Sequence, residues 1–139
     1  MRTLHGPKDY LELARAPGTP PEELARLAAA DFPFVWRALA ERPDLSTELL
    51  RSLARRPAAG WNGACLLGLI ARHPNADREA LLIVLAATAD LLGRGERPYA
   101  VALALARRIE LPAGEVSVLG GLAGASRRFR RGLRRALAH

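Results

Sequence analysis

The residues best suited to chemistry are six arginines close to the end of the chain, in the segment Ser126–His139. They are Arg127, Arg128, Arg130, Arg131, Arg134 and Arg135. Guanidinium groups bind carboxylates and phosphates through paired hydrogen bonds, so such a cluster points to an anionic ligand. The segment contains no acidic residue and holds six of the seven excess positive charges, so residues 1–126 carry a net charge of only +1. The sequence therefore predicts an anion-binding or nucleic-acid-binding site in this segment alone.

The same segment has the pattern of an amphipathic helix capped by Ser126. Its apolar residues fall on one face at helical spacing, and the arginines occupy the remainder. The apolar residues are Phe129, Leu133, Ala136 and Leu137. A basic helix of this kind can lie on a nucleic-acid backbone, an anionic membrane or an acidic protein. It can equally be a terminal helix that covers the core and keeps the end soluble, and both interpretations stay open.

Two tryptophans are candidates for partner binding. Trp36 and Trp61 stand in corresponding helices of successive predicted helix pairs, and Arg37 follows Trp36 directly. An exposed indole ring beside a guanidinium can anchor a protein partner or stack on a base. Core packing is the alternative interpretation, because tryptophan is mostly buried in globular proteins.

The remaining reactive side chains favour no catalytic or metal chemistry. His5, His73 and His139 are scattered, and Cys65 is the single cysteine, so no spacing matches a metal site or a disulfide framework. Glycine-rich phosphate loops are absent as well. We therefore expect no catalytic residue, no metal and no cofactor, and we do not expect an enzyme.

A sequence phrase, Leu-Ala-x-x-Pro, recurs with small changes and indicates where the helices that position these residues end. It occurs at Leu13–Pro17, Leu39–Pro43, Leu53–Pro57, Ile70–Pro74 and Leu105–Ile109. Proline ends a helix and forces the preceding residue out of the α region, so each phrase predicts a helix end and a turn. The two residues before the proline are often basic. We expect these cations to be stabilised by the free carbonyls at the end of their own helix.

A second pattern follows the first, second and fourth phrases in fixed register. A glutamate at the helix start is followed by two apolar positions that share one helix face. These positions are Glu22, Leu24 and Leu27; Glu48, Leu50 and Leu53; and Glu79, Leu81 and Val84. Helix N-caps are expected at Thr19, Asp31, Ser46, Asp77 and Ser126, with Glu22 completing a capping box. Together with the absence of period-two segments, this predicts an all-α fold of about nine short helices.

Composition limits the class of protein further. Half of the residues are apolar, mainly alanine and leucine, which favours helix over strand. No apolar run is long enough for a membrane span, and residues 1–10 lack the apolar core of a secretory signal. We expect one soluble cytoplasmic domain over residues 1–139, with residues 126–139 as its basic capping helix.

Over residues 13–86 the chain resembles the leucine-rich repeat variant, a family of HEAT-like α-solenoids. The stretches Thr19–Leu24 and Val35–Pro43 look like that family's first-helix and second-helix consensus. The resemblance implies a right-handed α-solenoid, although the spacing between the prolines of the phrases is irregular. Some members carry an iron–sulfur cluster on cysteines that this chain lacks. HEAT-like repeats also occur in DNA glycosylases, but no catalytic motif of that kind is present here.

The sequence thus predicts a non-catalytic helical-repeat binding module. One hypothesis is a protein-interaction adaptor that grips an acidic or extended segment through Trp36, Arg37 and Trp61. The other is a DNA-binding or RNA-binding protein that neutralises phosphates with its C-terminal arginines. A glycosylase-type enzyme is a remote third possibility. The sequence does not determine the oligomeric state.

Overall fold

The structure is a computed structural model that describes residues 6–56 and 60–138. Within these ranges it contains nine α-helices and one 3-10 helix, and no strand. The all-α prediction is confirmed. Pro57, His5 and His139, which entered the sequence analysis, lie outside the described residues.

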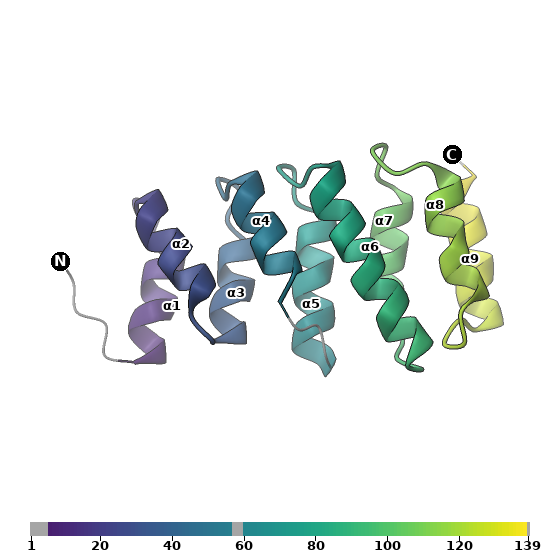
Figure 1. Ribbon diagram of the computed structural model, residues 1–139, viewed down its shortest axis with the longest axis horizontal. Coiled ribbons are helices and arrows are strands. Elements are labelled where there is room, and N and C mark those ends of the chain that lie inside the picture. Colours follow the sequence, from purple (N-terminus) through teal and green to yellow (C-terminus); the bar gives the residue numbers. More distant parts are fainter. Residues whose placement is uncertain (1–5, 57–59, 139) are drawn as a thin grey trace.

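The helices form two layers whose members alternate along the chain (Figure 1). The first layer comprises α1 (Pro7–Arg15), α3 (Pro33–Ala40), α5 (Gly60–Ala71), α7 (Tyr99–Ala106) and α9 (Arg127–Leu137). The second layer comprises α2 (Pro21–Ala29), α4 (Thr47–Ala54), α6 (Arg78–Gly93), α8 (Ala113–Ser117) and the 3-10 helix η1 (Val118–Gly121). Within the first layer each helix contacts the next one, so α1 and α9 lie at opposite ends of the molecule.

The core lies between the two layers and consists largely of leucine. The apolar positions of the recurring pattern are all buried, as their shared helix face predicts. These positions are Leu24, Leu27, Leu50, Leu53, Leu81 and Val84. The glutamates that precede them stand in the first turns of α2, α4 and α6. The pattern therefore marks the start and the buried face of α2, α4 and α6 in the second layer.

Three of the predicted helix caps are confirmed. The Ser46 hydroxyl accepts a hydrogen bond from the Leu49 N–H at 3.2 Å. The Asp77 carboxylate accepts one from the Ala80 N–H at 2.9 Å. Ser126 caps α9 in the same way. Each side chain satisfies one of the N–H groups that the first helical turn leaves without a partner.

Two predicted caps are wrong, and prolines explain both. Pro20 is the N-cap of α2, and the Thr19 hydroxyl instead donates to the carbonyls of Leu13 and Ala16 at 2.6 and 3.1 Å. Phe32, not Asp31, precedes α3. Each helix begins with a proline, which suits the first helical position because it has no N–H to satisfy. Thr19 is therefore free to bond to the end of α1.

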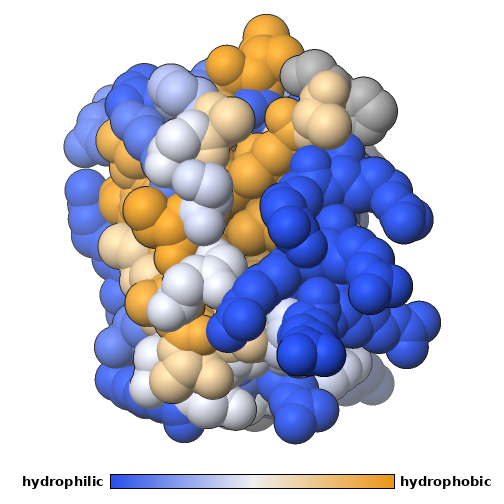
Figure 2. Space-filling model, turned by 90° about the vertical axis from the view of Figure 1, so that its right-hand side faces the viewer, coloured by the Kyte–Doolittle hydropathy of each residue, from blue (hydrophilic) through white to orange (hydrophobic). Residues whose placement is uncertain are grey.

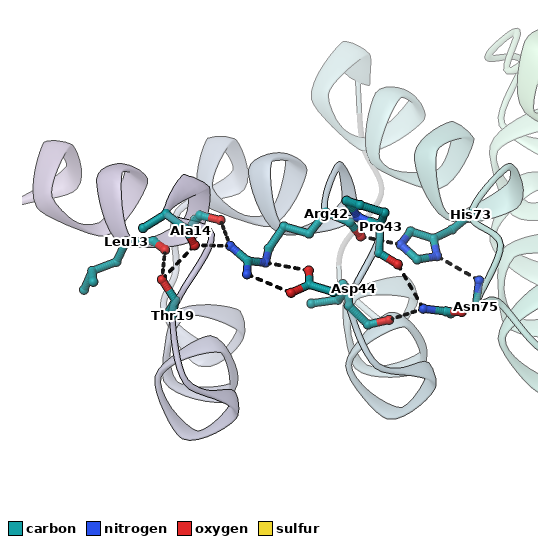
Figure 3. Close-up of polar contacts among 10 residues, drawn as sticks. Leu13, Ala14, Thr19, Arg42, Pro43, Asp44, His73 and Asn75 are labelled. Carbon is teal, nitrogen blue, oxygen red and sulfur yellow. Dashed lines mark hydrogen bonds and ion pairs between the residues drawn. The ribbon is translucent and has the colours of Figure 1, made fainter.

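In the second and fourth phrases, the residue before the proline forms hydrogen bonds to the previous helix of the same layer or to the turn that follows it (Figure 3). Arg42, which follows α3, donates through Nη1 to the Ala14 and Ala16 carbonyls at the end of α1, at 2.9 and 2.7 Å. Its Nε and Nη2 donate to the Asp44 carboxylate. His73, which follows α5, donates from Nε2 to the Arg42 carbonyl at 2.6 Å. The sequence predicts that an arginine at this position bonds to the carbonyls of its own helix, and that prediction is wrong for Arg42, which bonds to those of α1.

The same position acts alike further along the chain. Arg108, after α7, donates to the carbonyls of His73 and Ala76 at 2.9 and 2.7 Å, and to the Glu110 carboxylate. These hydrogen bonds from Arg108 lower the pKa of Glu110 below its ordinary value. In the second layer, Arg56 donates to the Ala28 carbonyl. The fourth residue of the phrase thus joins α3 to α1, α5 to α3 and α7 to α5 in the first layer, and α4 to α2 in the second.

Candidate anion-binding surface

Helix α9 closes the first layer and places all six arginines of the C-terminal cluster on the surface. Its apolar face packs inward, with Phe129, Leu133 and Ala136 buried and Leu137 half-buried. The Ser126 hydroxyl fixes the start of the helix by accepting a hydrogen bond from the Phe129 N–H at 3.1 Å. The predicted amphipathic helix is therefore confirmed, with every guanidinium-bearing residue exposed to water.

None of these six arginines has a carboxylate partner among residues 6–56 and 60–138, and the same holds for Arg15, Arg37, Arg56, Arg72, Arg97 and Arg107. Elsewhere, carboxylates pair with Arg26, Arg42, Arg51, Arg55, Arg78, Arg94 and Arg108. Hydrogen bonds from Arg51 and Arg78 lower the pKa of Asp77 and Glu115, respectively, because they favour the charged carboxylate. Among the side chains of the six arginines of α9, Arg130 alone donates a hydrogen bond within the described residues, from Nε to the Gly120 carbonyl at 2.8 Å. Carboxylates thus pair with seven of the arginines outside α9, whereas α9 concentrates six arginines without such a partner.

The arginines flank two hollows, one on each side of α9. The end hollow, of about 580 Å³, lies between α9 and the α8–η1 segment. It is lined by Ser117, Gly120, Arg127, Arg130, Arg131, Leu133, Arg134 and Leu137. Figure 2 looks onto this end of the molecule and shows a strongly hydrophilic surface directly beside a hydrophobic strip. The cluster that the sequence presents as one unit is therefore divided between two surfaces.

The second hollow, which we call the α7–α9 hollow, measures about 420 Å³. It is lined by Tyr99, Leu103, Ser126, Arg128, Phe129, Arg131, Gly132 and Arg135. Tyr99, Leu103 and Gly132 had not been singled out in the sequence. One feature of the sequence points to this hollow, namely a glycine inside an otherwise arginine-rich helix. Glycine is unfavourable within a helix, so its presence suggests that space is needed there. Which residues of α7 face that glycine depends on the packing of two helices that are distant in sequence.

The three residues proposed as partner anchors do not form one site. Trp36 is 4% exposed, donates from Nε1 to the Ala30 carbonyl at 2.7 Å, and lies under the Arg56 guanidinium. Its proposed role as a surface anchor is wrong, because the ring is enclosed by the core. Trp61, in contrast, is 68% exposed at the start of α5. The Arg37 guanidinium carbon lies 4.6 Å from the centre of the Trp61 ring, so these two residues do come together.

Outside α9, the described residues include one histidine, which is buried, and one cysteine, which is half-buried. His73 is buried, and its Nδ1 accepts a hydrogen bond from the Asn75 N–H while Nε2 donates to the Arg42 carbonyl. These two partners assign the Nε2–H tautomer. Cys65 is a half-buried free thiol. Within residues 6–56 and 60–138, no three histidine, cysteine or acidic side chains lie close enough to hold a metal ion. In the same ranges, no helix is long and apolar enough to cross a lipid bilayer.

Comparisons of the chain with protein-family models, with curated proteins and with solved structures gave no match.

Proposed function

We propose that the protein is a non-catalytic helical-repeat module that binds a protein partner through an acidic segment, with α9 as the binding surface. In this proposal the two alternating layers are a right-handed α-solenoid of the leucine-rich repeat variant or HEAT-like kind. Two features support that interpretation. The helices stack in chain order, and the fourth residue of the recurring phrase bonds to the previous helix of the same layer, or to the turn after it, in the phrases that follow α3, α4, α5 and α7. Stacked helices present extended surfaces that suit extended partners.

The observation that carries the proposal is the set of six exposed guanidiniums on α9 without carboxylate partners among the described residues. A helix that only covered the end of the core would be equally soluble with mixed charges, and mixed charges would repel each other less. Concentrating one sign of charge raises the local potential and attracts oppositely charged partners. Arginine also suits carboxylates through its planar pair of donors.

A protein partner is favoured over nucleic acid by where the charge lies. A nucleic-acid strand carries phosphates along its whole length, and a groove that follows it needs cations over a comparable length. Here six arginines without carboxylate partners gather on the last helix, whereas each other helix or loop of the described residues carries at most one. A short acidic segment needs only a surface of the size of α9.

The test uses two fluorescently labelled probes of equal charge, a glutamate-rich peptide and a single-stranded oligonucleotide. We expect the peptide to bind in low salt and to be released as salt screens the charges. A variant with all six arginines of α9 changed to glutamine should weaken peptide binding by about tenfold or more, because steering and pairing are both lost. Circular dichroism checks that the variant keeps its helices.

The control changes to glutamine the four exposed arginines outside α9 that have no carboxylate partner among the described residues, Arg15, Arg72, Arg97 and Arg107, and is compared with a variant that changes only four of the α9 arginines. It should bind the peptide nearly as well as the unaltered protein. Absence of binding between the unaltered protein and the peptide contradicts the proposal. So does protein that binds the oligonucleotide more tightly than the peptide, a result that favours the nucleic-acid hypothesis instead.

A further inference from the structure

We propose that the acidic partner docks on the α7 side of α9 and inserts one large apolar side chain into the α7–α9 hollow. This inference rests on the function proposed above and adds the chemistry of the occupant. The partner is an acidic segment with a single phenylalanine-like anchor between its carboxylates. Three independent features of the hollow support it, namely its floor, its open space and its charged rim.

The floor of the hollow is apolar and held in place. The Tyr99 and Phe129 rings stack with their centres 4.5 Å apart and their planes 9° from parallel. The Tyr99 hydroxyl donates to the Gly124 carbonyl at 2.7 Å, which fixes the ring from its far end. Leu103, half-buried on α7, completes the floor. A preformed apolar surface of this kind takes an apolar side chain at little cost in ordering.

The open space comes from Gly132 in the middle of α9. A Cβ atom built on Gly132 would have its nearest neighbour, the Leu103 Cδ2 atom, at 3.9 Å, which is ordinary contact. Neither a clash nor a positive φ angle therefore requires glycine there. Glycine nevertheless weakens a helix relative to alanine. We attribute the residue to the missing side chain, which leaves the hollow of about 420 Å³ open toward a partner.

The rim of the hollow carries Arg128, Arg131 and Arg135. On a helix, the first and last of these lie roughly 10 Å apart along the axis. None of the three has a described carboxylate partner, so each is available to a ligand. Carboxylates on both sides of an apolar anchor would meet these guanidiniums while the anchor fills the space over Gly132. The end hollow is less suited, because Arg130 is already bonded to the Gly120 carbonyl.

The first experiment compares two labelled glutamate-rich peptides that differ only at their central residue, phenylalanine in one and alanine in the other. The unaltered protein should bind the phenylalanine peptide about tenfold more tightly, since burial of one aromatic side chain accounts for that ratio. Equal affinities overturn the inference and leave the proposed function standing. If neither peptide binds, both fail.

The second experiment fills the hollow. Gly132→Leu should remove the preference for phenylalanine, so that the two peptides bind with equal affinity. Gly132→Ala, which adds only a methyl group, should reduce the preference by less. A preference that survives in Gly132→Leu places the anchor elsewhere and overturns the inference. Urea unfolding of both variants verifies that α9 stays folded.

A matched pair of double variants locates the acidic residues of the probe. R128Q/R135Q removes two charges that line only the α7–α9 hollow, and R127Q/R134Q removes two charges that line only the end hollow. The first variant should bind both peptides several-fold more weakly than the second variant does. Equal losses would mean that the probe reads only the total charge of α9, which retains the proposed function and refutes the docking site.

Discussion

Replacing Arg42 by methionine is the sharpest test of how the layers are held together. The guanidinium is 7% exposed and bridges the end of α1 to the Asp44 carboxylate. Methionine keeps an apolar stem of similar length, so the substitution removes the donors with little change in buried apolar volume. The Ala16 oxygen keeps the Thr19 hydroxyl as a second donor. The Ala14 oxygen has no second donor among the described residues.

The magnitude follows from these contacts. A buried carbonyl left without a donor costs about 1–3 kcal/mol, and hydrogen bonds to a charged group contribute about 1.5–3 kcal/mol. The Asp44 side chain is 58% exposed, so its carboxylate returns to water and adds little. We expect Arg42→Met to lower the free energy of unfolding by about 2–4 kcal/mol, a sizeable part of the total for a protein of this size.

The assay is urea unfolding followed by circular dichroism, with the midpoint compared at constant slope. The control is Arg26→Met, which removes an exposed ion pair with Glu23 and should cost less than about 1 kcal/mol. If the two substitutions cost the same, Arg42 does not hold α1 and α3 together in the way argued here, and the role assigned to the fourth residue of each phrase is refuted.

Three further predictions concern pH, packing and exposure. Hydrogen bonds from Arg51 lower the pKa of Asp77. The stabilising effect of the Asp77 carboxylate is therefore present at neutral pH and is lost as the pH falls through 3.8, the ordinary pKa of aspartate, and below. The urea midpoints of the unaltered protein and of Asp77→Asn should converge in acid. A Cβ at Gly124 would lie 2.5 Å from a backbone carbonyl oxygen of α6, so Gly124→Ala should lower the free energy of unfolding by about 1–3 kcal/mol, whereas Gly114→Ala, which meets no neighbour, should not. Acrylamide should quench the fluorescence of Trp36→Phe, which retains the exposed Trp61, far more than that of Trp61→Phe, and equal quenching would contradict the burial described for Trp36.

The sequence by itself determined where the helices lie and which face of each is buried. Leu50, Leu53 and the caps at Ser46 and Asp77 follow from interactions within one helix, since a cap and a helical stripe involve residues only a few positions apart. The exposed arginine face of α9 was predictable for the same reason, because every residue of the pattern belongs to one helix.

Only the tertiary structure decided which side chains act across helices. Thr19 bonds to α1 instead of capping α2, Arg42 bonds to α1 instead of its own helix, and Trp36 is enclosed while Trp61 is exposed. The α7–α9 hollow likewise requires Gly132 to face Leu103. Such contacts join residues that are distant in the chain, and local spacing carries no information on them. They depend on how far each helix is shifted and rotated against its neighbour, which the packing of the whole core determines.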